Sequence, residues 1–416
     1  MNVLVSASAH FVATGNGELW SGNGSLGYAT WARYLDVFDE VKLVVRAASH
    51  AVAPSGWNRA TGAGVVGVPV PDFRSLTELV TCYPTVRKQI QRALAETPAV
   101  ILRVPCPVGE MVWRALESER PYGVEVVGDP YGTFSPGSVQ HPLRAMFRWW
   151  FERQLRRQCV GASATAYVTA RELQAKYPSP IGTLSTHYSS VDLPEGAFSK
   201  APRSRRVRSK AIRLVTVGSL SRPYKATDVL IDAVAACVRG GLDVRLTVVG
   251  EGRYRARLER QVASAQLASR VRFTGQLTRP AAVREELDQA DLFILPSRHE
   301  GLPKAMLEAM ARGVPCLGSA VGGIPELLNA EDLVPPGDAD ALAAKIREVA
   351  SDGERLARTS AGNLEKARAY RSELLRLRRV EFYRYLRAKT EAGWPDREPV
   401  EKQSMMSECS EGKATS

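Results

Sequence analysis

The sequence is poor in the residue patterns that hold metal ions. Its six cysteines are scattered without a C-x-x-C pair, and its five histidines show no H-x-x-x-H spacing. Structural zinc sites depend on such close pairs, so we expect no structural metal. The D-x-D pattern at Asp338–Asp340 precedes a predicted helix and is more simply explained as an N-cap, so a metal-dependent site is not expected either.

Long apolar runs are also missing. No stretch approaches the roughly 18 apolar residues that a membrane-spanning helix needs. The N-terminus, MNVLVSASAHFVAT, lacks the basic leader and the long apolar core of a signal peptide. These absences predict a cytoplasmic protein in a reducing compartment.

Apolar and charged residues are both plentiful, at 44% and 24% of 416 residues. Single cores stop growing at about 250–300 residues, so we expect two domains. The net charge of +12 favours anionic partners such as nucleoside diphosphates, phospholipid headgroups or nucleic acid. No nucleic-acid-binding module is recognisable, so nucleic acid is not an expected partner.

Short runs rich in Val and Ile alternate with helical patterns in both halves, which predicts an α/β protein with parallel sheets. In the first half we expect strands at Val3–Ser6, Val41–Val45, Val100–Val104, Val124–Val127 and Ala166–Val168, and helices at Tyr28–Phe38, Thr85–Glu96, Gly109–Ser118, Leu143–Gln158 and Ala170–Tyr177. In the second half we expect strands at Ile212–Val217, Val244–Val249, Val271–Thr274, Leu292–Leu295 and Val314–Leu317, and helices at Ala226–Arg239, Tyr254–Ser264, Ala281–Gln289 and Pro303–Arg312.

The hydrophobic pattern lapses in a proline-containing and then basic stretch, which marks a domain boundary. We predict an N-terminal domain over residues 1–191, a linker over 192–210 and a doubly wound domain over 211–370. A helix over 371–388 and a disordered tail over 389–416 follow. Ligands of such sheets bind beyond the carboxyl ends of the strands, which places function in the loops found there.

The segment RHEGLPKAMLEAM (Arg298–Met310) carries two carboxylates, Glu300 and Glu308. Glu308 lies on a helix that is apolar around most of its circumference, so its carboxylate needs a polar partner. Helical geometry separates the two carboxylates by about 8–12 Å, roughly the span from a ribose to a hexose across a diphosphate. The alternative is an arginine partner for Glu308 inside the fold and a solvated Glu300.

Two further patterns lie in loops after strands. Arg222 and Lys225 follow Ile212–Val217, where fixed positive charge could stabilise a departing phosphate, although a solvated basic loop is the alternative. Gly322 and Gly323 follow Val314–Leu317 and permit close approach of a ligand to the backbone.

These residues carry a resemblance. VGSLSRPYKATDVLIDA, VVGEG, RVRFTGQL and ADLFILPSRHEGLPKAMLEAMARGVPCLGSAVGGIPELL resemble the C-terminal half of retaining glycosyltransferases of the family-4 type, also called glycosyl transferases group 1. The likeness covers about Ile212 to Leu328. It implies the GT-B fold, in which two Rossmann-like doubly wound domains face each other across a cleft.

The resemblance also implies roles. Glu300 would meet the hydroxyls of the donor sugar and Glu308 the ribose, while Arg222 and Lys225 would hold the diphosphate. The backbone near the sugar would come from Gly301, Leu302, Pro303 and Lys304. The family often has glycine after the lysine, where this chain has Ala226.

The N-terminal half resembles the family less. In LGYATWARYL, Gly27 takes the position that approaches the diphosphate, and Asp129 falls where relatives carry a His motif, with Gly128 in place of the histidine. Residues 22–27 also satisfy G-x-G-x-x-G, but they do not directly follow a strand, which argues against a nicotinamide or flavin site.

The helix at Pro142–Gln158 interleaves aromatic residues with arginines, as a membrane-surface helix does. Its aromatics fall on adjacent positions and therefore on both faces, so packing on its own domain is the favoured interpretation. Peripheral contact with the inner face of a membrane is the alternative.

Together these patterns predict a glycosyltransferase that moves a sugar from a UDP- or GDP-linked donor to a glycan, lipid-linked or small-molecule acceptor, with retention and without a cofactor. The alternatives are a nucleotide-sugar epimerase or phosphorylase of the same fold, and a non-catalytic sugar-binding relative.

Overall fold

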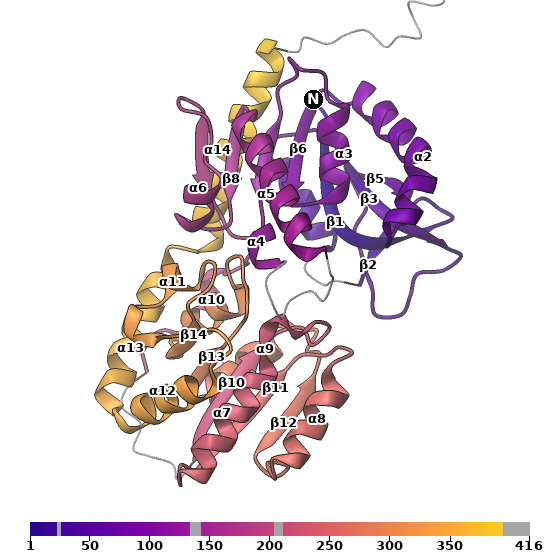
Figure 1. The fold of residues 1–416 in the computed structure, drawn as a ribbon. Helices are drawn as coiled ribbons and strands as arrows, with labels where there is room; N and C mark the ends of the chain where they lie inside the picture. The colour runs from indigo at the N-terminus through magenta and orange to yellow at the C-terminus, as the bar shows by residue number, and fades with distance from the viewer. Residues whose placement is uncertain (23–25, 134–142, 204–210, 394–416) are drawn as a thin grey trace, which may run out of the picture.

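The computed structural model describes residues 1–22, 26–133, 143–203 and 211–393, which form two α/β lobes (Figure 1). The N-terminal lobe, indigo to magenta, lies above the C-terminal lobe, pink to orange. The last helix, in yellow, runs up the side of the N-terminal lobe. The predicted fold class, two doubly wound domains of the GT-B type, is confirmed.

The N-terminal sheet has nine strands. Its parallel part runs β5-β3-β1-β6-β7-β8-β9, and the short β2 and β4 add an antiparallel edge beside β1. The strands are β1 (Val3–Thr14), β2 (Leu19–Ser21), β3 (Val41–His50), β4 (Asn58–Arg59), β5 (Val65–Pro71), β6 (Ala99–Val104), β7 (Gly123–Val126), β8 (Ala164–Tyr167) and β9 (Leu184–His187).

The C-terminal sheet has six strands, all parallel, in the order β12-β11-β10-β13-β14-β15. The strands are β10 (Ile212–Val217), β11 (Val244–Val249), β12 (Val271–Gly275), β13 (Leu292–Leu295), β14 (Cys316–Ser319) and β15 (Leu333–Val334). Their Val, Ile and Leu side chains are largely buried, because helices cover both faces of a doubly wound sheet.

Helices flank both sheets (Figure 1). Those of the N-terminal lobe are α1 (Tyr28–Trp31), α2 (Leu76–Ala95), α3 (Pro107–Ala115), α4 (Pro130–Thr133), α5 (Arg144–Val160) and α6 (Glu172–Lys176). Those that follow are α7 (Thr227–Arg239), α8 (Arg255–Ser264), α9 (Pro280–Gln289), α10 (Lys304–Ala311), α11 (Ile324–Leu327), α12 (Ala339–Ser351), α13 (Gly353–Arg368) and α14 (Ser372–Gly393).

The predicted elements of the C-terminal lobe agree with the structure to within two residues at each end, whereas those of the N-terminal lobe differ more. The predicted helix Tyr28–Phe38 divides into α1 and the 3-10 helix η2 (Ala32–Asp36). The strand β5, with the sequence VVGVPVP, was not predicted; as an edge strand it tolerates its prolines.

The helix α14 packs against β6, β8, β9 and η2, and thereby returns the chain to the N-terminal lobe. It continues to Gly393, so the disordered tail predicted from residue 389 was wrong for its first residues. Residues 394–416 lie outside the described part of the chain, as do residues 204–210 of the predicted linker.

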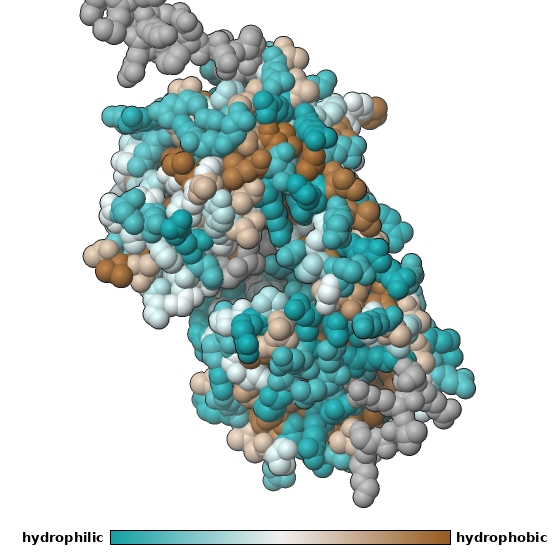
Figure 2. Space-filling view, turned by 180° about the vertical axis from the view of Figure 1, so that it is seen from behind, coloured by the Kyte–Doolittle hydropathy of each residue, from teal (hydrophilic) through white to brown (hydrophobic). Residues whose placement is uncertain are grey.

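Hydrophilic side chains cover most of the C-terminal lobe seen from behind, and larger apolar patches lie on the N-terminal lobe (Figure 2). Among the residues that the structure describes, no helix is both long and apolar enough to cross a bilayer.

Candidate functional site

The candidate donor site lies at the carboxyl edge of the C-terminal sheet, where β10 and β13 are neighbours. The chain leaves β10 toward β11 on one side and returns to β13 on the other, which makes this the topological switch point of the sheet. Ligands of doubly wound sheets bind at such a point. The loop after β10 carries Arg222 and Lys225, and the loop after β13 carries Glu300.

Lys225 and Glu300 form a buried ion pair, with 2.6 Å between Lys225 Nζ and Glu300 Oε1. Their side chains are 14% and 8% exposed. Ser297 Oγ donates to the same carboxylate oxygen at 2.6 Å. Burial pushes the pKa of the Lys225 ammonium down, the Glu300 carboxylate pushes it up, and the net result is a raised pKa. Glu300 is therefore buried and paired, and not the solvated carboxylate of the alternative interpretation.

The loops after β10 and β13 are joined to each other. The Arg298 guanidinium donates to both carboxylate oxygens of Asp228, at 3.0 and 2.8 Å, and the Arg298 backbone N–H donates to the Tyr224 carbonyl at 2.7 Å. The rings of Tyr224 and His299 stack with centroids 4.7 Å apart. A bidentate pair and a stacked ring pair fix geometry as well as adding energy, so these contacts hold the Lys225–Glu300 pair in place.

Ala226 stands where the resemblance leads one to expect glycine, and its backbone has a conformation that glycine favours. It has φ 52°, in the left-handed region, and forms the N-cap of α7. Glycine adopts this region at little cost, whereas a residue with a Cβ is strained by about 1–2 kcal/mol. The backbone therefore keeps the conformation that suits glycine although the residue is alanine.

The predicted glycine pair supports the backbone of the carboxylate loop. Gly322 has φ +51°, and a Cβ added there would overlap the Glu300 carbonyl oxygen. The Gly323 N–H donates to the Gly301 carbonyl at 2.7 Å, and a Cβ at Gly323 would lie only 2.6 Å from that oxygen. Both positions need glycine because the loop after β14 lies directly on Glu300 and Gly301.

The helix α10 begins after the buried Leu302 and Pro303 and carries Lys304 and Glu308 one turn apart. Burial raises the pKa of Glu308, opposed by Lys304 and Arg284, and burial lowers the pKa of Lys304. Within the described residues, the Glu308 carboxylate has no hydrogen bond and no ion pair. The polar partner that the sequence demands for Glu308 is therefore not supplied by this part of the chain, which leaves the carboxylate available to a ligand.

Positive charge gathers around this helix. Arg222 is exposed and, like Lys304, makes no ion pair with the described residues. His299 adds none, because burial is the main cause that lowers its pKa. The first backbone N–H groups of α10 have no acceptor within the helix, and Arg103, Arg33 and Lys225 lie near enough to Lys304 in this turn to help lower its pKa.

Two predicted residues, Gly27 and Asp129, belong to the N-terminal lobe and make no ion pair with Lys225 or Glu300. Gly27 is the N-cap of α1. Asp129 accepts hydrogen bonds from Tyr177 Oη at 2.7 Å, Lys176 Nζ at 3.0 Å and the Tyr131 N–H at 2.9 Å. Its carboxylate thus holds the segment before α4 to the end of α6.

The two lobes touch beside the carboxylate loop. A Cβ at Gly301 would lie 3.2 Å from the Val127 carbonyl oxygen, and one at Gly132 would lie 2.9 Å from His299 Cβ. The Glu326 carboxylate of the C-terminal lobe accepts the backbone N–H groups of Ala170, Arg171 and Glu172, at 2.7, 2.9 and 2.6 Å. An acceptor from one lobe thus caps the start of α6 in the other.

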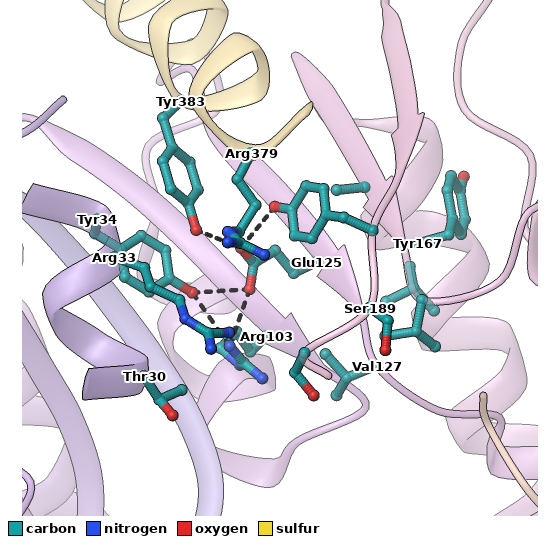
Figure 3. Close-up of a pocket in the computed structure, with 15 residues that line it drawn as sticks. Thr30, Arg33, Tyr34, Arg103, Glu125, Val127, Tyr167, Ser189, Arg379 and Tyr383 are labelled. Atoms are coloured by element: carbon teal, nitrogen blue, oxygen red, sulfur yellow. Dashed lines mark hydrogen bonds and ion pairs between the residues drawn. The ribbon is translucent and has the colours of Figure 1, made fainter. Parts of the chain in front are cut away.

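A pocket opens in the N-terminal lobe (Figure 3). At its floor is Glu125, which is 3% exposed. Oε2 accepts from Tyr34 Oη at 2.8 Å and lies 3.3 Å from Arg103 Nη1, and Oε1 accepts from Tyr188 Oη at 2.8 Å and Tyr383 Oη at 3.3 Å. Burial is the first cause that raises the pKa of all three tyrosines, so their hydroxyls remain donors at neutral pH.

Our sequence analysis missed this pocket and also missed Ser297, Tyr224 and His299. The last three lie within three residues of Glu300 or Lys225, so proximity to those motifs was a usable signal. Glu125 lies inside the predicted strand Val124–Val127, where a charged residue among valines was a second signal. Its tyrosine partners gave no signal, since they come from distant segments.

Comparison with known proteins gives a family match for the C-terminal lobe. Residues 211–352 match the family model described as glycosyl transferases group 1. Protein CapJ of Staphylococcus aureus is 26% identical over 318 residues, 76% of this chain and 78% of that protein. A GDP-mannose-dependent phosphatidylinositol dimannoside mannosyltransferase of Mycobacterium tuberculosis is 36% identical over 145 residues, but this match spans only 35% of the chain and 37% of that relative.

Solved structures resemble the whole chain. Sucrose-phosphate synthase of Thermosynechococcus elongatus has a TM-score of 0.67 at 19% identity, covering 94% of this chain and all of that one. Anabaena HepE, solved with UDP and glucose, has a TM-score of 0.64 at 18% identity over 92% of this chain and 98% of its own. At such identities the likeness concerns the fold. The chain thus has the GT-B fold, and residues 211–352 of its C-terminal lobe match the group 1 glycosyltransferases.

Proposed function

We propose that this protein transfers a sugar, with retention, from a UDP- or GDP-linked donor to an acceptor hydroxyl in the synthesis of a polysaccharide or glycoconjugate. The observation that carries the proposal is the buried Lys225–Glu300 pair at the switch point, with the unpaired Glu308 carboxylate on the adjoining helix. Relatives and structural neighbours whose names include GDP-mannose or UDP support both donor classes.

In this proposal the donor diphosphate lies against Lys225 and Arg222, whose charges stabilise the negative charge that builds up on the departing phosphate. Glu308 binds the ribose hydroxyls and Glu300 the sugar hydroxyls. The backbone of Gly301–Lys304, supported by Gly322 and Gly323, approaches the sugar, and Gly27 approaches the diphosphate from the other lobe. Asp129 belongs to the acceptor side, where its carboxylate also holds the segment before α4 to α6.

The chemical step joins the acceptor oxygen to the anomeric carbon while the bond from that carbon to the phosphate oxygen breaks. Both events take place on the same face of the sugar, which retains the configuration. The departing phosphate accepts the proton of the acceptor hydroxyl, so the electron pair of the broken bond and the proton both end on the nucleoside diphosphate. No basic side chain is required at this point.

The test is an assay with UDP- and GDP-sugars, with and without acceptors, followed by NMR of the anomeric configuration. We expect transfer with retention, abolished in Lys225→Ala. An epimerase would turn the donor over without any acceptor, and a phosphorylase would require phosphate. Unchanged sugar binding in Lys225→Ala, with no turnover of any donor by the wild type, would indicate a non-catalytic relative.

We also propose peripheral membrane contact through α5. Met146 and Trp149 are 51% and 60% exposed on this helix. The Arg153 guanidinium lies 5.7 Å from the Trp149 ring centroid. Arginine beside exposed apolar side chains suits an anionic lipid surface, where a lipid-linked acceptor would reside.

A further inference from the structure

The pocket above Glu125 contains a buried cation without a partner. Arg379 enters it from α14 and is 8% exposed. Its Nε and Nη1 groups have no hydrogen-bond partner, and its guanidinium makes no ion pair with the described residues. The guanidinium does lie 5.9 Å from the Tyr188 ring centroid, but a ring face does not accept its N–H groups as an anion would.

Glu125 does not satisfy this charge. Both of its oxygens already accept from tyrosine hydroxyls, and its ion pair is with Arg103. The charge of Glu125 is therefore already balanced by Arg103. Arg379 adds a further positive charge to the pocket.

A second cation faces the same space from the opposite wall. Arg33, on η2, lines the pocket and makes no ion pair with the described residues. Its pKa is lowered, first by burial and then by Arg379, while Asp192 opposes the shift. Figure 3 shows Arg379 descending from α14 and Arg33 projecting from η2 toward the middle of the pocket. The charge of Arg379 thus lies close enough to help lower the pKa of Arg33, and neither guanidinium is neutralised by an ion pair with the described residues.

The pocket adjoins the donor site. Val127 and Val168 line it, and a Cβ at Gly301 would lie 3.2 Å from the Val127 carbonyl oxygen and 3.6 Å from Val168 Cγ2. Gly301 belongs to the segment proposed to approach the donor sugar. A molecule in the pocket is therefore placed to meet that sugar, and the donor diphosphate has cations of its own in the other lobe.

We propose that Arg33 and Arg379 bind an oxyanion of the acceptor, a carboxylate or a phosphate group. Burying a guanidinium without an opposite charge costs free energy. An oxyanion that accepts charge-assisted hydrogen bonds from the guanidinium offsets that cost. This inference rests on the proposed function, since it names the chemical class of the acceptor of the same reaction. It selects an acidic sugar or a phosphorylated acceptor over a neutral one.

The experiment measures the thermal midpoint Tm of the full chain at saturating UDP or GDP, which occupies the donor site and keeps other anions from it. Glucose 6-phosphate, glucuronate and neutral glucose are then added in turn. We expect one or both charged sugars to raise Tm, and glucose to leave it unchanged. A response to glucose 6-phosphate alone identifies a phosphate group, and a response to glucuronate alone identifies a carboxylate.

The variants are Arg379→Gln and Arg33→Gln, with Arg384→Gln as the matched control, because Arg384 is exposed on the same α14 helix. Losing charged hydrogen bonds should weaken the charged sugar by about 10- to 100-fold in the first two variants and leave the control unchanged. The shift of Tm with nucleotide alone shows that each variant is folded. If Arg379→Gln does not fold, Arg33→Gln carries the test.

The proposal is overturned if neither charged sugar binds, if glucose binds as tightly, or if both variants bind the charged sugar like the wild type. Absence of any shift with UDP or GDP would instead count against the proposed function. The two failures are thus separate, because nucleotide and charged sugar are added independently.

Discussion

The two sides of the cleft are built in different ways. On the proposed donor side, Lys225 pairs with Glu300 and Arg298 pairs with Asp228, and these residues lie in the loops after β10 and β13 or in the first turn of α7. On the proposed acceptor side, the pocket is assembled from segments far apart in the sequence: α1 with η2, β6, β7, β8, the segment after β9, and α14. The proposed donor side is built from neighbouring segments around a buried ion pair, whereas the proposed acceptor side is built from distant segments and leaves Arg33 and Arg379 without an ion pair among the described residues.

This difference separates a general task from a particular one. Every donor of the proposed class presents a diphosphate and a ribose, so a fixed set of charges on rigid loops serves them all. An acceptor differs from one pathway to the next, and a pocket made from several distant segments can change one wall without disturbing the others. The family model accordingly matches residues 211–352 and not the N-terminal lobe.

The largest expected effect is on the paired donor side. Lys225→Ala should lower kcat by about 10²–10³-fold, because a fixed charge that stabilises the departing phosphate is removed. It should also lower the free energy of unfolding by about 3–5 kcal/mol, since Glu300 is left buried without its partner. Steady-state kinetics and denaturant unfolding measure the two effects.

The double variant Lys225→Met, Glu300→Gln separates the effect on kcat from the effect on stability. Removing both charges should recover most of the stability without recovering activity. If the double variant regains transfer along with stability, the Lys225 charge has no part in the chemistry.

A glycine substitution tests whether the donor loops must be rigid. Gly322→Ala places a Cβ against the Glu300 carbonyl oxygen and should displace the carboxylate loop. A misplacement of about 1 Å can lower kcat by about 10²-fold. Gly337→Ala is the matched control, because Gly337 also has positive φ but nothing lies within 4 Å of an added Cβ. Equal kinetic losses in both variants would show that backbone strain, and not the contact with Glu300, is responsible.

The same contrast explains how far the sequence could be interpreted. Strands β10 to β14 follow short apolar runs such as IRLVTV, and Lys225 and Glu300 fall in the loops after two of them, with Glu308 on the helix that follows. These elements and candidate site residues could therefore be predicted, whereas β15 and α13 were not. In the N-terminal lobe, one predicted helix is divided at Ala32, and β5 was not predicted because it contains prolines, which are not typical of strands. A pattern along the chain gives periodicity but not which distant residues meet, so the union of Glu125 with Tyr34, Tyr188 and Tyr383 could not be predicted.

The sequence also showed that the Glu308 carboxylate needs a polar partner, but not what that partner is. The apolar helix around Glu308 showed that the carboxylate needs a polar partner, and the described structure leaves that need open. The buried charge of Arg379 had no such signal, because α14 carries many arginines and most of its surface is polar. The need of Glu308 for a partner can be recognised from the residues around it in the sequence. That of Arg379 arises only from the tertiary packing of α14.

The contact between the lobes should have a smaller effect. Glu326→Gln removes the charge that accepts the three N–H groups at the start of α6 and should lower the free energy of unfolding by about 1.5–3 kcal/mol. Glu331→Gln, an exposed carboxylate nearby in the sequence, is the control. Calorimetry should show the two lobes unfolding less cooperatively in Glu326→Gln; an unchanged transition would mean that other contacts hold the lobes together.

The smallest expected effect concerns the outer surface of the acceptor side. In co-sedimentation with vesicles of phosphatidylglycerol and phosphatidylcholine, Trp149→Ala should weaken binding by about tenfold or less. Tenfold is about 1.4 kcal/mol, and a side chain only partly buried at a lipid surface contributes less than the roughly 1.5–3 kcal/mol of full burial. Ile181→Ala is the control, because Ile181 is fully exposed on the same lobe but away from α5. Wild-type protein that stays in the supernatant would favour α5 as a helix packed only on its own domain. The dispersed acceptor side would then differ from the donor side in its pocket alone, and the acceptor would reach that pocket from solution.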